Sequence, residues 1–364
     1  MTEDFCPIQA FDHVEFYVGN AKQAAQYYER CFGFTNTFYK GLETGEREVA
    51  SYIMDQGAIR LILTTALSPD HPISHQVHRH GDGVGRIGLR VPDARAAFAA
   101  TVERGAEAAE EPRVIDNGNS EIVVSAIKAY GDTLFEFVER DPASLNDLPG
   151  FEKRNEHVRG SGAGLTNIDH IVGNVELGKM NEWVNFFANT LGFSQLAHFD
   201  DDAISTEYSA LMSKVMQDGS GKIKFPINEP ADGRKKSQIE EYLEYYGGPG
   251  VQHIACATRD IIGTVRALRD GGVEFLQVPT TYYEELESRV GKIDEDVDTL
   301  AELGILVDRD DDGYLLQIFT QPVEDRPTVF YEVIERHGAR GFGEGNFKSL
   351  FEAIEREQAA RGNL

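Results

Sequence analysis

The chain has 364 residues, of which 41% are hydrophobic, so it can bury the cores of two domains. Its net charge of −26 argues against binding to nucleic acid or anionic membranes, because both require a basic surface. The three cysteines have no regular spacing, and neither a secretory signal nor an apolar stretch of about 18 residues is visible. We therefore expect a cytoplasmic protein without a membrane span.

The first half predicts several segments in chain order. Residues 11–34, FDHVEFYVGNAKQAAQYYERCFGF, read as a strand with Asp-His, a turn and an amphipathic helix that ends before Gly-Phe. Residues 71–80, HPISHQVHRH, hold four histidines without a carboxylate or thiolate to complete a metal site, so we interpret them as an exposed polar segment. Residues 83–112 predict a strand, a helix begun by Asp and a second strand, and residues 133–140, TLFEFVER, predict another strand.

A polar, glycine-rich segment divides the chain. Residues 154–166, RNEHVRGSGAGLT, predict a linker, because no GK[ST] follows that would make them a phosphate loop. The two halves are then about 1–155 and 165–364.

The second half repeats the first. Residues 168–193, IDHIVGNVELGKMNEWVNFFANTLGF, match the opening segment of the first half. Residues 250–279 match the strand–helix–strand segment, and residues 329–336, VFYEVIER, match the last strand. Each half is thus a tandem of small strand–helix–strands units, and the predicted fold class is α+β.

Overlaying the halves aligns three polar positions on predicted strands. In the second half they are His170, His253 and Glu332, and in the first half His13, Arg86 and Glu136. A guanidinium has no lone pair for a metal, so the second half alone keeps a candidate metal site. Two histidines and one glutamate suit Fe(II) in oxygenases. Zinc accepts the same ligands, usually in hydrolases, but no HExxH signature is present.

Other readings of these residues remain open at this point. A single buried histidine is more often part of a core than a metal ligand. Glu332 lies in an otherwise apolar strand, where an unpaired carboxylate is costly. The alternative to a metal ligand is an ion pair between Glu332 and Arg336 or Arg340.

Five segments of the second half carry a family resemblance. They are DHIVGNV at 169–175, FPINEPADG at 225–233, KSQIEEYLEYYGGPGVQHIA at 236–255, DGYLLQIFTQP at 312–322 and RPTVFYEVIERHGARGFGEGNFKSLFEAIEREQAARGNL at 326–364. These segments resemble the 4-hydroxyphenylpyruvate dioxygenase family, within the vicinal-oxygen-chelate superfamily. The resemblance covers nearly all of the second half and extends more loosely to the first.

The resemblance implies tandem βαβββ modules that form two open β-barrel domains, as in glyoxalases and dihydroxybiphenyl dioxygenase. The N-terminal domain would lack a metal, and the C-terminal domain would bind one Fe(II) per chain through His170, His253 and Glu332. No catalytic side chain beyond these ligands is implied. The implied substrate-binding residues are Ser213, Asn228, Gln238, Gln252, Gln317, Phe319, Phe330, Phe347 and Leu350.

Strand alternation supports part of this pocket. Phe330 shares a strand face with Glu332, and Gln317 shares one with Phe319. Gln252, in contrast, should point away from its neighbour His253 unless a bulge or twist intervenes.

The end of the chain predicts a helix that serves as a lid. Asn346 is a suitable N-cap, and Phe347, Leu350, Phe351 and Ile354 would form one apolar face. Such a face can simply pack on the barrel, or it can also cover a substrate and exclude water.

The implied reaction converts 4-hydroxyphenylpyruvate and O₂ to homogentisate and CO₂ in tyrosine and phenylalanine catabolism. Hydroxymandelate synthase shares the fold, ligands and substrate, but Pro226-Ile227-Asn228 and the aromatic residues favour ring hydroxylation. A metal-free binding protein on the same fold is another alternative, and a metal-dependent lyase or isomerase that works without O₂ is a third. We also expect a homo-oligomer, which the net charge does not forbid.

Overall fold

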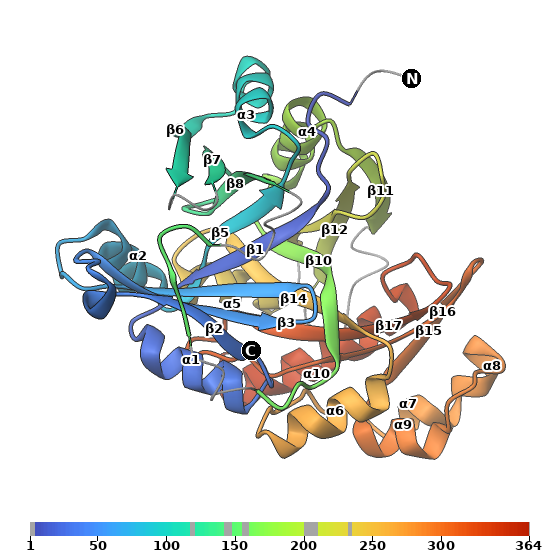
Figure 1. Cartoon of the computed structure of the whole chain (residues 1–364). Coiled ribbons are helices and arrows are strands. Elements are labelled where there is room, and N and C mark those ends of the chain that lie inside the picture. Colours follow the sequence, from blue (N-terminus) through green and yellow to red (C-terminus); the bar gives the residue numbers. More distant parts are fainter. Residues whose placement is uncertain are drawn as a thin grey trace.

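The computed structural model describes residues 4–116, 121–141, 148–154, 160–199, 210–231 and 235–363 (Figure 1). The strands form two large curved sheets, and helices surround them. Residues 155–159, in the predicted linker, lie outside the described residues.

The first sheet has nine strands in the order β6-β7-β8-β5-β1-β4-β3-β2-β9. Their bounds are β1 (Ala10–Tyr17), β2 (Thr35–Lys40), β3 (Val49–Gln56), β4 (Ile59–Ala66), β5 (Gly83–Arg90), β6 (Ala108–Asp116), β7 (Glu121–Lys128), β8 (Leu134–Arg140) and β9 (Glu152–Lys153).

The second sheet has eight strands in the order β11-β12-β13-β10-β14-β17-β16-β15. Their bounds are β10 (Leu165–Asn174), β11 (Ser194–Phe199), β12 (Ala210–Gln217), β13 (Lys224–Ala231), β14 (Gly250–Thr258), β15 (Leu306–Asp310), β16 (Gly313–Phe319) and β17 (Phe330–His337).

The helices connect and flank these strands. They are α1 (Ala21–Arg30), the 3₁₀ turn η1 (Leu42–Thr44), α2 (Pro72–His80), α3 (Ala94–Glu103), α4 (Met180–Leu191), α5 (Gln238–Tyr246), α6 (Ile261–Asp270), α7 (Thr281–Glu284), α8 (Leu286–Val290), α9 (Val297–Leu303) and α10 (Glu344–Ala360). In Figure 1, α6 to α9 gather at one end of the second sheet, where α8 packs on β15 and α6 on β17.

Each sheet contains two βαβββ modules, and the first sheet has β9 as an additional edge strand. In the first module, β1 leads through α1 to β2, β3 and β4, and β4 returns to pair parallel with β1. The antiparallel pair β1–β5 joins the two modules of the first sheet, and β10–β14 does so in the second. The predicted α+β class, with tandem modules that form open half-barrels, is confirmed.

The strand register confirms the overlay of the two halves. His13 pairs with Gly88 across β1 and β5, and Gly88 pairs with Glu136 across β5 and β8. The equivalent residues of the second half, paired in the same way, are His170, Ala255 and Glu332.

Two β-bulges recur at matching positions in the halves. In the second half, Asp169 of β10 and Gln252 of β14 are the extra residues, which have no partner in the pairing of these two strands. In the first half, the pairing of β1 with β5 passes over Asp12 and Gly85. A bulge interrupts strict alternation, so two consecutive side chains can face the same side of a sheet.

Helix α4 matches its prediction. Its apolar residues recur at helical spacing, and Phe187 and Leu191 are buried. Gly192 ends the helix in the left-handed conformation, with φ of 74°, where glycine is favoured because it has no Cβ.

Helix α10 begins earlier than predicted. Its N-cap is Gly343, so the prediction of Asn346 as the cap is wrong. The Asn346 side chain is buried, and its Oδ1 accepts a hydrogen bond of 2.6 Å from the hydroxyl of Tyr282. The oxygen that would have capped the helix is thus used in a tertiary contact.

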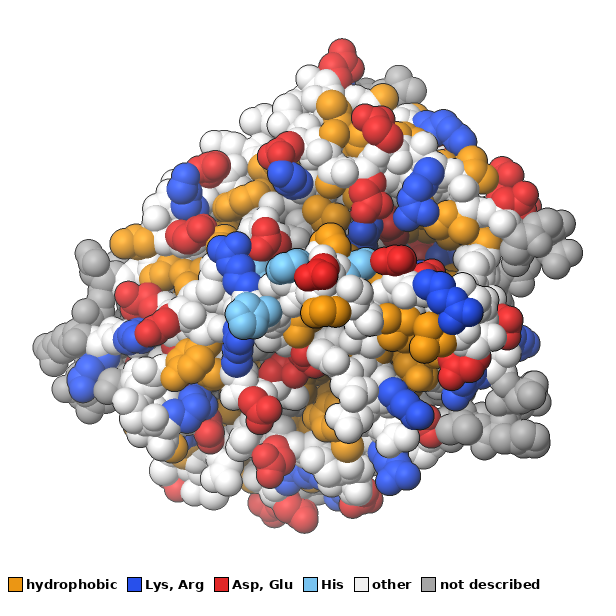
Figure 2. All heavy atoms as spheres, turned by 90° about the vertical axis from the view of Figure 1, so that its left-hand side faces the viewer, with side chains coloured by type: hydrophobic (Ala, Val, Ile, Leu, Met, Phe, Trp, Pro, Cys, Tyr) orange, Lys and Arg blue, Asp and Glu red, His pale blue; other side chains and the backbone are white. Residues whose placement is uncertain are grey.

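The histidine-rich segment is a helix, α2, for which His71 is the N-cap. His75 and His78 are exposed, as predicted, and histidine side chains are visible on the face of Figure 2, where acidic and basic side chains are interspersed. The prediction fails for His80, which is only 2% exposed. Its ring stacks on Tyr246 of the second half, and its Nε2 lies 2.8 Å from the carboxylate of Asp132.

One hydrophobic core extends through both halves. It includes Phe16 and Phe135 from the first sheet together with Phe225 and Tyr331 from the second. Among the described residues, no helix combines the length and apolarity needed to span a membrane.

Candidate metal centre

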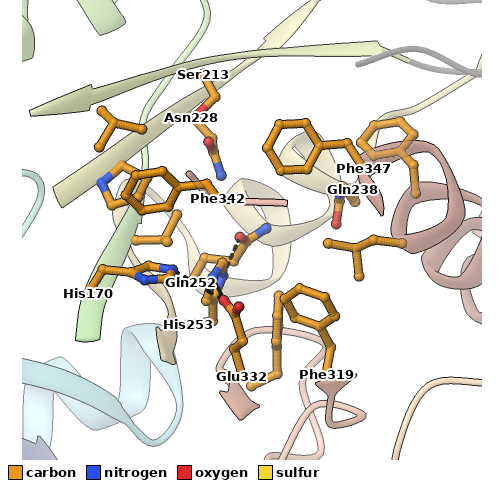
Figure 3. A pocket seen from close by; sticks show the side chains of 16 residues that line it. His170, Ser213, Asn228, Gln238, Gln252, His253, Phe319, Glu332, Phe342 and Phe347 are labelled. Atoms are coloured by element: carbon orange, nitrogen blue, oxygen red, sulfur yellow. Dashed lines mark hydrogen bonds and ion pairs between the residues drawn. The ribbon is translucent and has the colours of Figure 1, made fainter. Parts of the chain in front are cut away.

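Three neighbouring strands of the second sheet bring His170, His253 and Glu332 together (Figure 3). The residues belong to β10, β14 and β17, and each is at most 8% exposed. Oε2 of Glu332 lies 3.2 Å from Nε2 of His170 and 3.4 Å from Nε2 of His253. One ligand atom from each residue lies within 4.8 Å of the others, and within the described part of the chain no other such group of histidine, cysteine and acidic residues occurs.

Two bulge residues orient the histidines. Nδ1 of His170 lies 2.8 Å from Oδ1 of Asp169, and Nδ1 of His253 lies 3.0 Å from Oε1 of Gln252. With Nδ1 donating to an oxygen, Nε2 keeps its lone pair and faces Glu332. Gln252 points toward His253 because a bulge at Gln252, the exception named for the expected alternation, interrupts β14.

The ionised carboxylate of Glu332 suits a metal cation, whereas the pKa values of the two histidines shift in opposite directions. Burial raises the pKa of Glu332, but the two histidines lower it further, to about 2, so this carboxyl is ionised at neutral pH. Burial lowers the pKa of His253, whereas at His170 the carboxylates of Glu332 and Asp169 outweigh burial and raise the pKa.

The alternative ion pairs of Glu332 do not form. Arg336 lies 2.8 Å from Asp169, and Arg340 lies 3.6 Å from Asp312. The donor set of two imidazole nitrogens and one carboxylate, buried together, fits a divalent first-row metal with open coordination positions.

The cluster lies at one wall of a cavity of about 70 Å³. Ser213 and Asn228, paired on β12 and β13, lie away from Glu332 in Figure 3. The cavity is lined by His170, Val172, Ser213, Val215, Pro226, Asn228, Gln238, Gln252, His253, Phe319, Phe330, Glu332, Phe342, Phe347, Leu350 and Phe351.

Most of the predicted pocket residues line this cavity, and Gln317 is the exception. The Gln317 side chain is 1% exposed and lies against Gly343, the N-cap of α10. A Cβ added to Gly343 would come within 2.3 Å of Nε2 of Gln317. Neither amide atom of Gln317 has a hydrogen-bond partner among the described residues. Gln317 therefore lies beside the cavity and not on its wall, although it alternates with Phe319 as expected.

Several lining residues were not predicted as part of the site. Phe342 is the most informative, because its ring lies 5.0 Å from that of His170. Its position between two glycines reveals nothing of this contact in the sequence. The strand periodicity could have indicated Val215, two residues after Ser213, and the helical periodicity places Phe351 on the apolar face of the lid helix but not among the substrate-binding residues. The other unpredicted lining residues are Val172 and Pro226.

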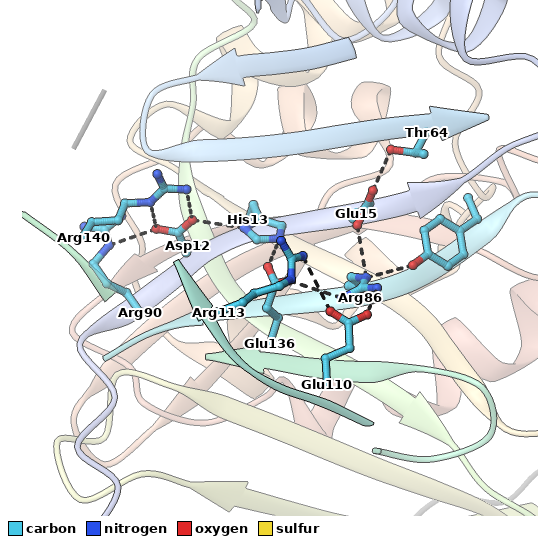
Figure 4. A network of polar contacts seen from close by, with 11 residues as sticks. Asp12, His13, Glu15, Thr64, Arg86, Arg90, Glu110, Arg113, Glu136 and Arg140 are labelled. Atoms are coloured by element: carbon cyan, nitrogen blue, oxygen red, sulfur yellow. Dashed lines mark hydrogen bonds and ion pairs between the residues drawn. The ribbon is translucent and has the colours of Figure 1, made fainter. Parts of the chain in front are cut away.

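The equivalent position in the first half is filled by a charged side chain (Figure 4). Nε2 of His13 lies 3.3 Å from Glu136, as in the second half. The guanidinium of Arg86 contacts Glu136 at 3.2 Å and also pairs with Glu110, and its Nε donates to the hydroxyl of Tyr17. Arg86 thus provides positive charge where the second half has the imidazole of His253.

Comparison with known proteins defines the class. Residues 167–318 match the model of the Glyoxalase/Bleomycin resistance protein/Dioxygenase superfamily, and residues 3–148 match that of "Hydroxyphenylpyruvate dioxygenase, HPPD, N-terminal". A Mn(II)-bound glyoxalase from Novosphingobium aromaticivorans shares the fold, with a TM-score of 0.51 and 13% identity over 90% of this chain and 82% of that one. The chain is therefore a vicinal-oxygen-chelate protein with two half-barrels and a candidate metal centre in the second.

More similar relatives identify the family within this class. A 4-hydroxyphenylpyruvate dioxygenase from Yarrowia lipolytica is 44% identical over 100% of this chain and 96% of its own length. One from Dictyostelium discoideum is 46% identical over 98% of this chain and 100% of its own length. This chain belongs to the 4-hydroxyphenylpyruvate dioxygenase family.

A solved structure of another activity is also similar. A triple mutant of 4-hydroxymandelate synthase from Streptomyces coelicolor superposes with a TM-score of 0.86 at 32% identity, covering 97% of this chain and 99% of that one.

Proposed function

We propose that this chain is an Fe(II)-dependent dioxygenase that converts 4-hydroxyphenylpyruvate and O₂ to homogentisate and CO₂. The observation that carries the proposal is the buried cluster of His170, His253 and Glu332 at the wall of an aromatic cavity. Family membership supplies the substrate. In this proposal, residues 1–155 form a domain without metal, and residues 165–364 form the catalytic domain with α10 as its lid.

The proposed metal is held by the side chains that face one another in the cluster. Nε2 of His170, Nε2 of His253 and the Glu332 carboxylate would be the protein ligands, which leaves positions for the 2-oxo acid and for O₂. Bound Fe(II) would supply chelation of the 2-oxo acid and electrons for O₂. Asp169 and Gln252 hold the histidine rings through Nδ1, which would keep both Nε2 atoms directed at the metal.

The remaining lining residues would orient the substrate and exclude water. Phe319 and Phe330 flank the His253 ring, at centroid distances of 6.1 and 4.7 Å, and provide apolar walls for an aromatic ring. Ser213 and Asn228, on the far wall, offer hydrogen-bonding groups for a phenol. The side chains of Phe347 and Leu350 cover the cavity from α10, which keeps bulk water from a reactive centre.

The biological setting is part of the same proposal. The reaction would belong to tyrosine and phenylalanine catabolism in the cytoplasm, and the homo-oligomer expected from the sequence remains a prediction.

Hydroxymandelate synthesis is the second candidate, because the superposition with the synthase covers nearly the whole chain. It would use the same ligands and substrate but oxidise the benzylic carbon. The relatives named above, at 44% and 46% identity, favour the first candidate over the synthase at 32%.

The test measures O₂ uptake by Fe(II)-loaded protein given 4-hydroxyphenylpyruvate, with the product identified by chromatography. Glu332→Gln should reduce turnover by roughly 100-fold or more, because it removes the anionic ligand. Glu136→Gln is the matched control, since it makes the same change at the equivalent position of the first half, and it should retain turnover per folded molecule.

The outcomes separate the candidates. Homogentisate supports the proposal, and hydroxymandelate assigns the second reaction to the same metal centre. If Glu332→Gln and Glu136→Gln both turn over like the parent, or if the parent consumes no O₂, the dioxygenase proposal is wrong.

A further inference from the structure

Asp169 forms the centre of a short chain of contacts behind the metal centre. One of its oxygens lies 2.8 Å from Nδ1 of His170. Both oxygens accept hydrogen bonds from Arg336, from Nε at 2.8 Å and from Nη2 at 2.8 Å, so the pair is bidentate. The carboxylate is 10% exposed and the guanidinium side chain 18%, which limits screening by solvent.

The remaining nitrogen of Arg336 reaches the segment that leads to α10. Its Nη1 donates to the carbonyl oxygen of Gly341 at 2.7 Å and to that of Ala339 at 3.2 Å. These two residues lie between β17 and α10. The planar guanidinium of Arg336 therefore makes two sets of hydrogen bonds. One set binds Asp169, which contacts the proposed metal ligand His170, and the other binds the segment between β17 and the proposed lid helix α10.

Phe342 connects the segment before α10 directly to His170. It directly follows the carbonyl that Arg336 binds, and it lines the cavity. Its ring lies 5.0 Å from the ring of His170 and 5.8 Å from the guanidinium of Arg336. The imidazole, the carboxylate, the guanidinium and the phenyl ring thus pack as one unit, and movement of the lid approach would disturb the orientation of His170.

We infer that Arg336 is a positioning residue that couples the metal ligand His170 to the docking of the lid helix α10. The inference rests on the proposed function, because it takes His170 as a ligand and α10 as a lid. It assigns to one side chain a role in both metal affinity and closure of the cavity. A substitution of Arg336 that removes its hydrogen bonds to Asp169 and to the segment before α10 should therefore weaken metal affinity and loosen α10 together.

The first half provides a control for the structural part of this role. Arg140 lies four residues after Glu136, as Arg336 lies four residues after Glu332. Nε and Nη2 of Arg140 each lie 2.8 Å from Asp12, which in turn lies 3.0 Å from Nδ1 of His13. The same ion pair thus occurs with the same geometry in a half that has no proposed metal centre.

The experiment compares Arg336→Lys with Arg140→Lys. A lysine keeps the charge but cannot form the bidentate pair and the carbonyl contacts at once. The measurements are the dissociation constant for Co(II), with the visible absorption spectrum of the bound ion, and deuterium uptake of residues 342–360 in the metal-loaded protein. A thermal melt of each variant measures the structural cost.

We expect Arg336→Lys to bind Co(II) roughly 10- to 100-fold more weakly than the parent, with an altered spectrum and faster exchange in residues 342–360. Arg140→Lys should lower the melting temperature without changing metal affinity, spectrum or exchange there. If Arg336→Lys accumulates poorly, Asp169→Asn tests the link through exchange in residues 342–360, because it keeps the shape of the side chain and removes the charge that Arg336 binds. Its metal affinity is not used for this purpose, since Asp169 also contacts His170 directly.

Two results overturn the inference and are distinct from failure of the proposed function. In the first, the parent binds Co(II) and turns over substrate, but Arg336→Lys binds the metal within twofold of the parent. In the second, Arg336→Lys weakens metal binding while exchange in residues 342–360 stays at the parental rate, so no coupling exists. A parent that neither binds metal nor turns over substrate overturns the proposed function itself.

Discussion

At the scale of single residues, an extra residue in a strand decides how the site is built. The bulges at Asp169 and Gln252 turn these side chains toward the histidines next to them. In regular strands, neighbours point to opposite faces, so neither could hold the adjacent ring. The first half retains the bulge at Asp12, whereas the counterpart of Gln252 is Gly85, which has no side chain to offer.

The charge network of the first half predicts a loss of stability at alkaline pH. Burial alone lowers the pKa of His13, but Asp12 and Glu136 raise it to about 9, above the ordinary value of 6.5. Because the folded-state pKa is raised, the stabilisation is fully present below pH 6.5 and disappears as pH rises through 9.

Urea denaturation between about pH 6 and 10 checks this prediction. The free energy of unfolding should fall over this range by roughly 1–3 kcal/mol in the parent. In His13→Gln, which cannot lose this proton, that part of the fall should be absent. The same fall in both proteins would contradict the assignment to His13.

At the scale of elements, α10 combines a packing face with a lining face. Phe351 is 2% exposed and packs in a cluster with Val215, Ile239 and Phe342, whereas Phe347 is only partly buried beside this cluster. Both side chains line the cavity. The apolar stripe expected from helical spacing is therefore present, and its members differ in how deeply they are buried.

Alanine substitutions should separate the two contributions. Phe351→Ala should lower the free energy of unfolding by about 3 kcal/mol, because it leaves a cavity in a buried cluster. Phe347→Ala should cost less than about 1.5 kcal/mol but raise the KM for 4-hydroxyphenylpyruvate, since it opens the cavity to water. Chemical denaturation and steady-state kinetics measure these effects, and equal stability losses would argue against a division of roles.

At the scale of the whole molecule, the two halves share buried contacts and do not merely lie side by side. The hydroxyl of Tyr331 on β17 donates to the hydroxyl of Tyr28 on α1 at 3.0 Å, and both rings are buried. Phe32 of the first half packs on the Tyr331 ring at 4.9 Å. Strand β17, which carries Glu332, is thus supported from the N-terminal half.

A double-mutant cycle tests this support. Tyr331→Phe removes the donor and should cost about 1–2 kcal/mol, because the Tyr28 hydroxyl loses its bond inside the core. The double variant with Tyr28→Phe should cost less than the sum of the single variants. If the free-energy losses of the two single variants, measured by urea denaturation, add strictly in the double variant, this hydrogen bond does not stabilise the contact between the two halves.

The sequence by itself determined the repeat, the fold class and the alignment of His170, His253 and Glu332. It could do so because strand and helix periodicities are local, and because aligning the two halves of a duplicated chain identifies equivalent positions without a structure. The apolar face of α10 followed from the same periodicity.

Only the tertiary structure decided which neighbours serve those residues. The bulges that direct Asp169 and Gln252 arise from pairing between strands, which no single-strand pattern records. The packing of Phe342 on His170 and the burial of His80 against Tyr246 join residues that lie far apart in the chain. Such contacts depend on how the sheets curve and meet, and local periodicity carries no information about that.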